Sequence, residues 1–265
     1  MSVTFVEAAP VRRANQQRRL EEIDAAVKEL GLGMGGGEVH FPVLIAREVL
    51  ERADYHQAFP HLLLAAAHLR HLDFDDEALL GPDNLLCSAW CLSPAVCYHA
   101  YAQLAGRELS SPQVITARGR CFRHEAVVEP GVRQIEFEMR EIVLLGEEGW
   151  VQETAEAARN SLEGLAHQFG LHGSWQPAED PFFLPRAQGK ALLQRLLGLK
   201  LEYCITEPVP LALASVNRHD TFFGQRFGIT DRSGQPIHTA CIAAGLDRWA
   251  AHASPILSEE TPCMT

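Results

Sequence analysis

The chain has 265 residues and a mass of 29.3 kDa, a size typical of one large globular domain or two small ones. Its 23 lysines and arginines are outnumbered by 34 aspartates and glutamates, and the formal net charge of −11 disfavours general binding of nucleic acid. Hydrophobic residues make up 47% and charged residues 22%, which excludes a disordered chain.

Compartment and redox state are indicated by what the sequence lacks. No apolar run approaches the ~20 residues of a membrane span, and the first residues have no signal-peptide core. We therefore expect a cytoplasmic protein without a membrane partner. The seven cysteines, odd in number and irregular in spacing, are then expected to be thiols or metal ligands.

The chain begins with a predicted helix. Helix formers dominate residues 14–30, with apolar residues at helical spacing. The glycine run at 31–37 predicts a flexible hinge, because no strand precedes it and no Gly-Lys-Ser/Thr follows, as a phosphate loop would require. We therefore expect residues 1–37 to form an N-terminal helix and hinge, and residues 38–265 to form the main domain.

The main domain is rich in expected strands. Extended segments are predicted at 39–45, 114–128, 133–145, 210–216, 222–229 and 237–245, and helices at 46–53, 150–171, 187–203 and from Leu246 onward. Because strands outnumber β-α-β units, we expect the α+β class, with helices packed on an antiparallel sheet.

Two of these strands carry a chemical pattern. Alternation places Arg123 and Glu125 on one face of the first strand, and Arg133, Phe137 and Glu141 on one face of the second. If the strands pair through the turn between them, the surface suits a nucleoside triphosphate: guanidinium groups bind phosphates, the ring stacks on the base and a carboxylate accepts from its amino group. A salt-bridged amphipathic hairpin without a ligand is the simpler interpretation of the pattern alone.

The same hairpin resembles a known motif. CFRHE, followed by Arg133-x-x-x-Phe137, resembles motif 2 of class II aminoacyl-tRNA synthetases, in the form found in the seryl enzymes. EVHFPVLIAREVLERADYHQAFPHL resembles motif 1, with Pro42 at the motif proline, and HTACIAAGLDRWAAH resembles motif 3, with Arg248 as its arginine. LALASVNRHDTFFGQRF resembles the segment that lines the amino-acid pocket. The order of the motifs implies a class II catalytic domain over residues 38–265.

Further details resemble one branch of this class. LSPAVCYH, FEMREIV, DPFF and ASVNRHDTFFG look most like the amino acid:carrier-protein ligases, and the chain leaves no room for a tRNA-binding arm before motif 1 or an anticodon domain after motif 3. The resemblance implies that a small amino acid is activated with ATP and passed to the phosphopantetheine thiol of a carrier protein, without tRNA. Motif 1 implies a homodimer.

The resemblance assigns the ATP site residue by residue. Arg123 is expected to contact the α-phosphate and the substrate carboxylate, and Glu125 the adenine amino group. Phe137 is expected to stack on adenine, Arg133 to reach the outer phosphates and Arg248 to bind the γ-phosphate.

The amino-acid site is assigned in the same way. Ser215 and Asn217 are expected on the pocket wall, and Asp180 of DPFF near the substrate amine. Class II enzymes usually carry a Mg²⁺-binding acid just before the segment that contains Ser215, but this chain has PLALA there. Glu202 or Glu207 is the expected substitute.

A zinc site is also implied. Cys97, Glu141 and Cys241 are far apart and form no CxxC motif, and an isolated cysteine in an apolar segment is most often a buried small hydrophobic residue. In the carrier-protein ligases, however, a Cys–Glu–Cys set at the matching positions holds Zn²⁺, with the fourth position left for the substrate amine. This arrangement favours glycine or alanine as substrate, while a serine-like or β-amino substrate stays open.

A docking element for the carrier is expected between residues 181 and 201, which contain no acidic residue. On one continuous helix, Arg186, Lys190 and Lys200 would lie within about 80° of arc, suited to an acidic carrier protein. A solvated helix face is the alternative.

Two other functions are considered. A catalytically lapsed class II paralogue could bind an amino acid or nucleotide as a signal, but the intact set of ATP-site residues argues against it. A tRNA-binding factor would need a basic surface or an added domain, which the sequence does not offer.

Overall fold

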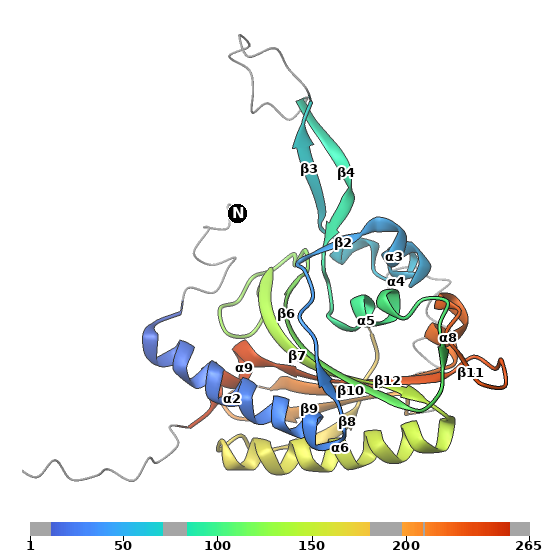
Figure 1. Cartoon of the computed structure of the whole chain (residues 1–265). Helices are drawn as coiled ribbons and strands as arrows, with labels where there is room; N and C mark the ends of the chain where they lie inside the picture. The colour runs from blue at the N-terminus through green and yellow to red at the C-terminus, as the bar shows by residue number, and fades with distance from the viewer. Residues whose placement is uncertain (1–11, 71–83, 181–197, 209, 255–265) are drawn as a thin grey trace, which may run out of the picture.

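The computed structural model describes residues 12–70, 84–180, 198–208 and 210–254. Its centre is a seven-stranded sheet in the order β1-β6-β7-β12-β10-β9-β8 (Figure 1). The strands are β1 (Gly37–Glu38), β6 (Gln113–Phe122), β7 (Glu136–Gly146), β8 (Gly173–Pro177), β9 (Lys200–Ile205), β10 (Leu211–Asp220) and β12 (His238–Gly245). All neighbouring pairs are antiparallel except β1 and β6, so the predicted antiparallel sheet is confirmed.

Helices cover both faces of this sheet. They are α2 (Ala14–Gly33), α3 (Arg47–Arg52), α4 (Tyr55–Ala58), η1 (Pro60–Leu62), α5 (Cys97–Gln103), α6 (Glu148–Gln168), α8 (Phe222–Phe227) and α9 (Leu246–His252). Helices α2, α6 and α9 pack on one face, and α5 and α8 on the other. Alternation on β7 supplies both cores: Ile142 and Leu144 face the first set of helices, and Val143 and Leu145 the second. Within the described ranges, no helix is long and apolar enough to cross a bilayer.

A smaller sheet projects from the body (Figure 1). It consists of β2 (Leu44–Ala46), β4 (Leu85–Leu92) and β3 (Ala65–Leu69), in that order. Large apolar side chains on or beside these strands are exposed: Val43, Leu44, Leu69, Leu85, Leu86 and Trp90. We call these six residues the apolar face. A two-stranded parallel sheet of β5 (Glu108–Leu109) and β11 (Thr230–Asp231) completes the fold.

The predicted N-terminal helix is present and continues into the glycine run. Helix α2 ends at Gly33, and its Leu20, Ile23 and Val27 side chains are fully buried in the core against the central sheet. Gly31 lies so close to the side chains of Thr116 and Ile142 that an added Cβ would come within 2.9 Å of Thr116 Cβ. The division of the chain after residue 37 stays a prediction.

Two predicted elements are wrong in the described residues. Residues 222–227 form α8 instead of a strand, because Phe223 and Phe227, four residues apart, both pack on Tyr101. Lys200–Ile205 is strand β9 instead of the end of a helix, because β8 and β10 pair with it on either side.

Candidate active site

A cavity of about 820 Å³ opens on the face of the central sheet that carries α5 and α8. Its lining includes the residues that the sequence analysis assigned to ATP, amino acid and zinc: Cys97, Arg123, Glu125, Arg133, Phe137, Glu141, Asp180, Ser215, Asn217, Cys241 and Arg248. Segments that are far apart in the chain therefore meet in one cavity. The roles assigned to these residues stay predictions.

Strand register brings them together. Glu141 on β7 pairs with Ala243 on β12, which pairs with Ser215 on β10, and Ser215 pairs with Glu202 on β9. On each of β12, β10 and β9, the residue two positions away forms a second row: Cys241 pairs with Asn217, and Asn217 pairs with Lys200. Residues two apart on a strand share a face, so both rows point into the cavity.

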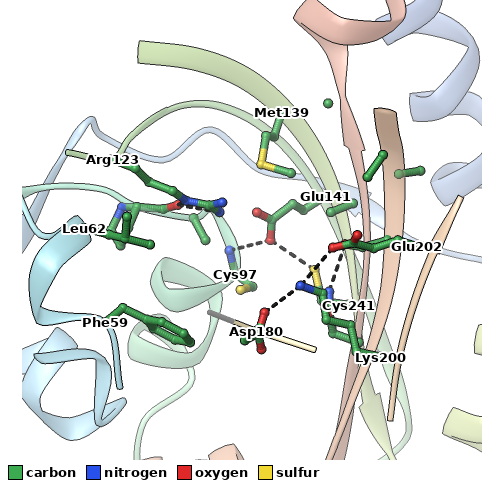
Figure 2. Close-up of a pocket in the computed structure, with 18 of the residues that line it drawn as sticks. Phe59, Leu62, Cys97, Arg123, Met139, Glu141, Asp180, Lys200, Glu202 and Cys241 are labelled. Atoms are coloured by element: carbon green, nitrogen blue, oxygen red, sulfur yellow. Dashed lines mark hydrogen bonds and ion pairs between the residues drawn. The ribbon is translucent and has the colours of Figure 1, made fainter. Parts of the chain in front are cut away.

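Cys97, Glu141 and Cys241 form a buried cluster (Figure 2). The two sulfur atoms and a carboxylate oxygen lie within 4.8 Å of one another. The Glu141 carboxylate accepts hydrogen bonds from the backbone N–H groups of Val96 and Cys97, both at 2.9 Å, and from Cys241 Sγ at 3.0 Å. The start of α5 thus fixes the carboxylate in place.

The donor set of this cluster fits a zinc ion. The hydrogen bond with Cys97, burial and the Glu141 carboxylate raise the pKa of Cys241 well above its usual range. The hydrogen bond from Cys241 lowers the pKa of Cys97, but burial and Glu141 outweigh it and the pKa is raised. A divalent cation would reverse this balance, because it binds cysteine as the thiolate. Two sulfurs and one carboxylate oxygen leave one of four tetrahedral positions open.

Cationic side chains also line the cavity. The Arg123 guanidinium lies 5.1 Å from the centre of the Phe137 ring, so the predicted pair on the hairpin is in contact. Arg248 donates to the carbonyl oxygens of Val132 at 2.8 Å and Ala212 at 2.7 Å. Burial, followed by the charge of Arg123, lowers the pKa of Arg248. A bound polyanion would relieve this repulsion.

Arg133 and Glu125, which also line the cavity, form an ion pair at 3.6 Å. The Arg133 side chain is 58% exposed, so it can swing toward a ligand at little cost. Its predicted role at the outer phosphates needs this freedom.

Lys200 lies within the cavity, which corrects its predicted place on a docking helix. It is buried on β9, and its Nζ atom binds Asp180 at 2.6 Å and Glu202 at 3.0 Å (Figure 2). A buried, doubly paired ammonium group cannot meet an incoming carrier protein. Arg186 and Lys190 lie outside the described residues.

The residues predicted to bind the amino acid also line the cavity. Asn217 Nδ2 donates to Ser215 Oγ at 3.0 Å, so these two predicted wall residues are in contact. Asp180 also lines the cavity, but its carboxylate is already bound to Lys200. Of the two candidate magnesium ligands, Glu202 is a cavity residue, whereas Glu207 is not part of the lining.

Sequence reasoning missed Tyr55 as a cavity residue. It is 4% exposed, and burial raises its pKa to about 12. Its hydroxyl finds no hydrogen-bond partner among the residues that the structure describes. The tyrosine stands inside the stretch that resembles motif 1, but nothing in its spacing indicated that it would reach the cavity.

Comparisons with known proteins identify the family. No protein-family model matches the chain. Over 229 residues it is 33% identical to amino acid–[acyl-carrier-protein] ligase 1 of Bradyrhizobium diazoefficiens, covering 82% of this chain and 70% of the relative. Ligase 2 of the same organism is 32% identical over 225 residues, covering 80% and 67%. The chain belongs to this ligase family.

More distant relatives agree with this assignment. A type-2 serine–tRNA ligase of Methanocaldococcus jannaschii is 26% identical over 88% of this chain. The fold matches the solved structure of M. kandleri SerRS in complex with A. aeolicus tRNASec (TM-score 0.70, 20% identity) over 88% of this chain. It also matches Giardia lamblia prolyl-tRNA synthetase bound to prolyl-adenylate (TM-score 0.70, 15% identity) over 92%. The chain spans about half the length of these synthetases (49%, 51% and 46%), and the class II synthetase fold is confirmed.

Proposed function

We propose that this protein activates a small amino acid with ATP and transfers it to the phosphopantetheine thiol of a carrier protein. One observation carries the proposal: a cluster suited to an amine-binding metal and a cationic, ring-bearing group of residues suited to ATP line the same cavity. The family relationship to amino acid–[acyl-carrier-protein] ligases supports the choice of acceptor.

The reaction has two steps, an adenylyl transfer followed by an acyl transfer. In the first, a carboxylate oxygen of the amino acid attacks the α-phosphorus of ATP, and pyrophosphate leaves with the bonding electrons. In the second, the carrier thiolate attacks the acyl carbon of the adenylate, and AMP leaves. Alignment and charge neutralisation dominate the first step, and the Arg123 and Arg248 guanidinium groups are proposed to supply both.

The Cys97, Glu141 and Cys241 side chains would hold a zinc ion at the amino-acid end. When bound, the metal supplies a Lewis-acid position for the neutral substrate amine. Glu202 is proposed as a magnesium ligand, because it lies in the cavity opposite Ser215.

We propose glycine or alanine as the substrate. Support comes from the bulky side chains at the amino-acid end, where Tyr98, His219 and Phe223 line the cavity. These aromatic rings pack against one another. The ring centres of His219 and Phe223 are 4.7 Å apart, and those of Tyr98 and Phe223 are 6.0 Å apart. A pocket closed by packed rings favours a small side chain.

We also propose a homodimer formed through the apolar face. Isolated exposed apolar residues are ordinary, but six that gather on one projecting sheet indicate an interaction surface. Placement beside the stretch that resembles motif 1 favours a second copy of the chain as the partner.

ATP–pyrophosphate exchange tests the activation step. The purified protein is assayed with a panel of amino acids, with zinc present and after chelation. We expect exchange with glycine or alanine that chelation abolishes. A folded, zinc-loaded protein that gives no exchange with any amino acid would instead support the lapsed paralogue.

A further inference from the structure

A buried ionic network joins the N-terminal region to the two strands and the helix that carry the proposed ATP site, and its two acids, Glu138 and Asp247, also line the cavity. Arg12 donates to Asp247 Oδ1 from Nε at 2.9 Å and from Nη2 at 2.6 Å, and to Glu138 Oε1 from Nη1 at 2.6 Å. Both carboxylates are buried, with Glu138 6% and Asp247 7% exposed. Helix α2, which follows Arg12, packs beside α9 (Figure 1).

The positions of these two acids connect the network to ATP. Asp247 directly precedes Arg248, and Glu138 directly follows Phe137. The Asp247 Oδ2 atom also accepts the backbone N–H of Glu138 at 2.5 Å. The start of α9 is thereby fastened to β7 at the residues next to the two ATP-site side chains.

The two acids depend on Arg12 to different degrees. Glu138 has a second cationic partner, because Arg118 Nε donates to its Oε2 at 2.6 Å. Within the described part of the chain, Arg12 is the one cation that pairs with Asp247. Removing Arg12 would leave the buried Asp247 carboxylate without this cation and next to the Glu138 carboxylate. Removing one partner of a buried ion pair is strongly unfavourable.

We propose that Arg12 is a positioning residue for the ATP site. Resting on the proposed function, the inference is that Arg12 acts through Asp247 and Glu138 to hold Arg248 and Phe137 at the spacing that ATP requires. Without Arg12, repulsion between the two carboxylates moves the start of α9 away from β7. The Cys97, Glu141 and Cys241 cluster is not part of this network, so amino-acid affinity is unaffected.

Pyrophosphate exchange with three variants of the full chain tests this role. Arg12→Ala is expected to raise the KM for ATP about tenfold or more, with an unchanged KM for the amino acid. Arg12→Lys, which keeps the charge but loses the forked geometry, should fall between Arg12→Ala and the wild type. Arg18→Ala, at an exposed arginine on α2, the helix that follows Arg12, is the matched control and should leave both constants unchanged.

Two results would overturn the inference. One is an unchanged KM for ATP in a folded Arg12→Ala protein. The other is a parallel rise of both KM values, which indicates a general structural loss. If the wild type itself gives no exchange, the proposed function fails. The role of Arg12 is then tested separately by calorimetric titration of the wild type and Arg12→Ala with ATP. Equal affinities of the two proteins for ATP would contradict this role.

Discussion

Glu141 on β7 accepts a hydrogen bond from Cys241 on β12 at 3.0 Å, although 100 residues separate them in the chain. These two strands carry the stretches that resemble motifs 2 and 3. Their pairing places the Cys97, Glu141 and Cys241 cluster and the residues proposed to bind ATP around one cavity.

Zinc content provides the first prediction. Cys241→Ala should remove one of three protein ligands and reduce bound zinc by about tenfold or more, with loss of exchange activity. Cys87→Ser, at an exposed cysteine outside the cavity, is the control and should bind zinc as the wild type does. Metal analysis of the purified proteins measures this, and a full complement of zinc in Cys241→Ala would refute the assigned ligand set.

Arg123 gives a prediction about geometry rather than charge. Arg123→Lys keeps the positive charge but loses the planar fork that stacks on Phe137 and can bind two oxygens. We expect kcat for exchange to fall about 10²-fold, as for the loss of one group that stabilises a transition state. Steady-state kinetics at saturating ATP measure it. An unchanged kcat would contradict the assignment of Arg123 to the phosphate site.

Alternation predicts only the hairpin residues of this site, and the other site residues are expected from the resemblance to class II synthetases. Strict alternation put Arg123 and Phe137 on one face of a hairpin, and strand pairing then brought them into contact. Lys200 could not be placed in this way, because an isolated basic residue in an apolar segment fits a helix face as well as a strand. The contact between Arg12 and Asp247 spans 235 residues and has no local pattern at all.

We predict that stability in acid depends on His99, a partly buried histidine on α5. Burial lowers the pKa of His99 to about 4, where its ring stacks on Phe41 and lies 3.1 Å from Ser93 Oγ. Between pH 6.5 and 4 the unfolded state binds a proton that the folded state does not, so the free energy of unfolding falls as the pH is lowered.

His99→Gln should therefore flatten the pH dependence of stability over this range. Urea unfolding at pH 7 and pH 5 measures the effect, and the wild type should lose more stability between the two values than the variant. An identical loss in both proteins would show that other groups govern acid unfolding.

The apolar face gives a prediction about assembly. Trp90→Glu places a charge on a side chain that is 50% exposed and should convert the dimer to a monomer in light scattering. Val127→Glu, at a 67% exposed residue outside the apolar face, should leave the dimer intact. A wild-type protein that is monomeric at micromolar concentration would contradict the proposal.

Carrier docking is predicted at the basic segment that contains Arg186 and Lys190. The double charge reversal to glutamate should raise the KM for the carrier about tenfold, because rim charges steer and hold an acidic partner, while exchange stays unchanged. Arg232→Glu, at an exposed arginine elsewhere, serves as the control. Equal loss of exchange and transfer would place these residues in the active site or the fold instead.

The mass of a holo carrier protein after incubation with this protein, ATP and glycine or alanine tests the central claim most directly. We predict that the carrier gains the mass of one aminoacyl group, and that hydroxylamine, which cleaves thioesters, removes it. An apo carrier, which lacks the phosphopantetheine thiol, should gain nothing. An unmodified holo carrier, in the presence of a protein that supports pyrophosphate exchange, would contradict the account and indicate a different acceptor.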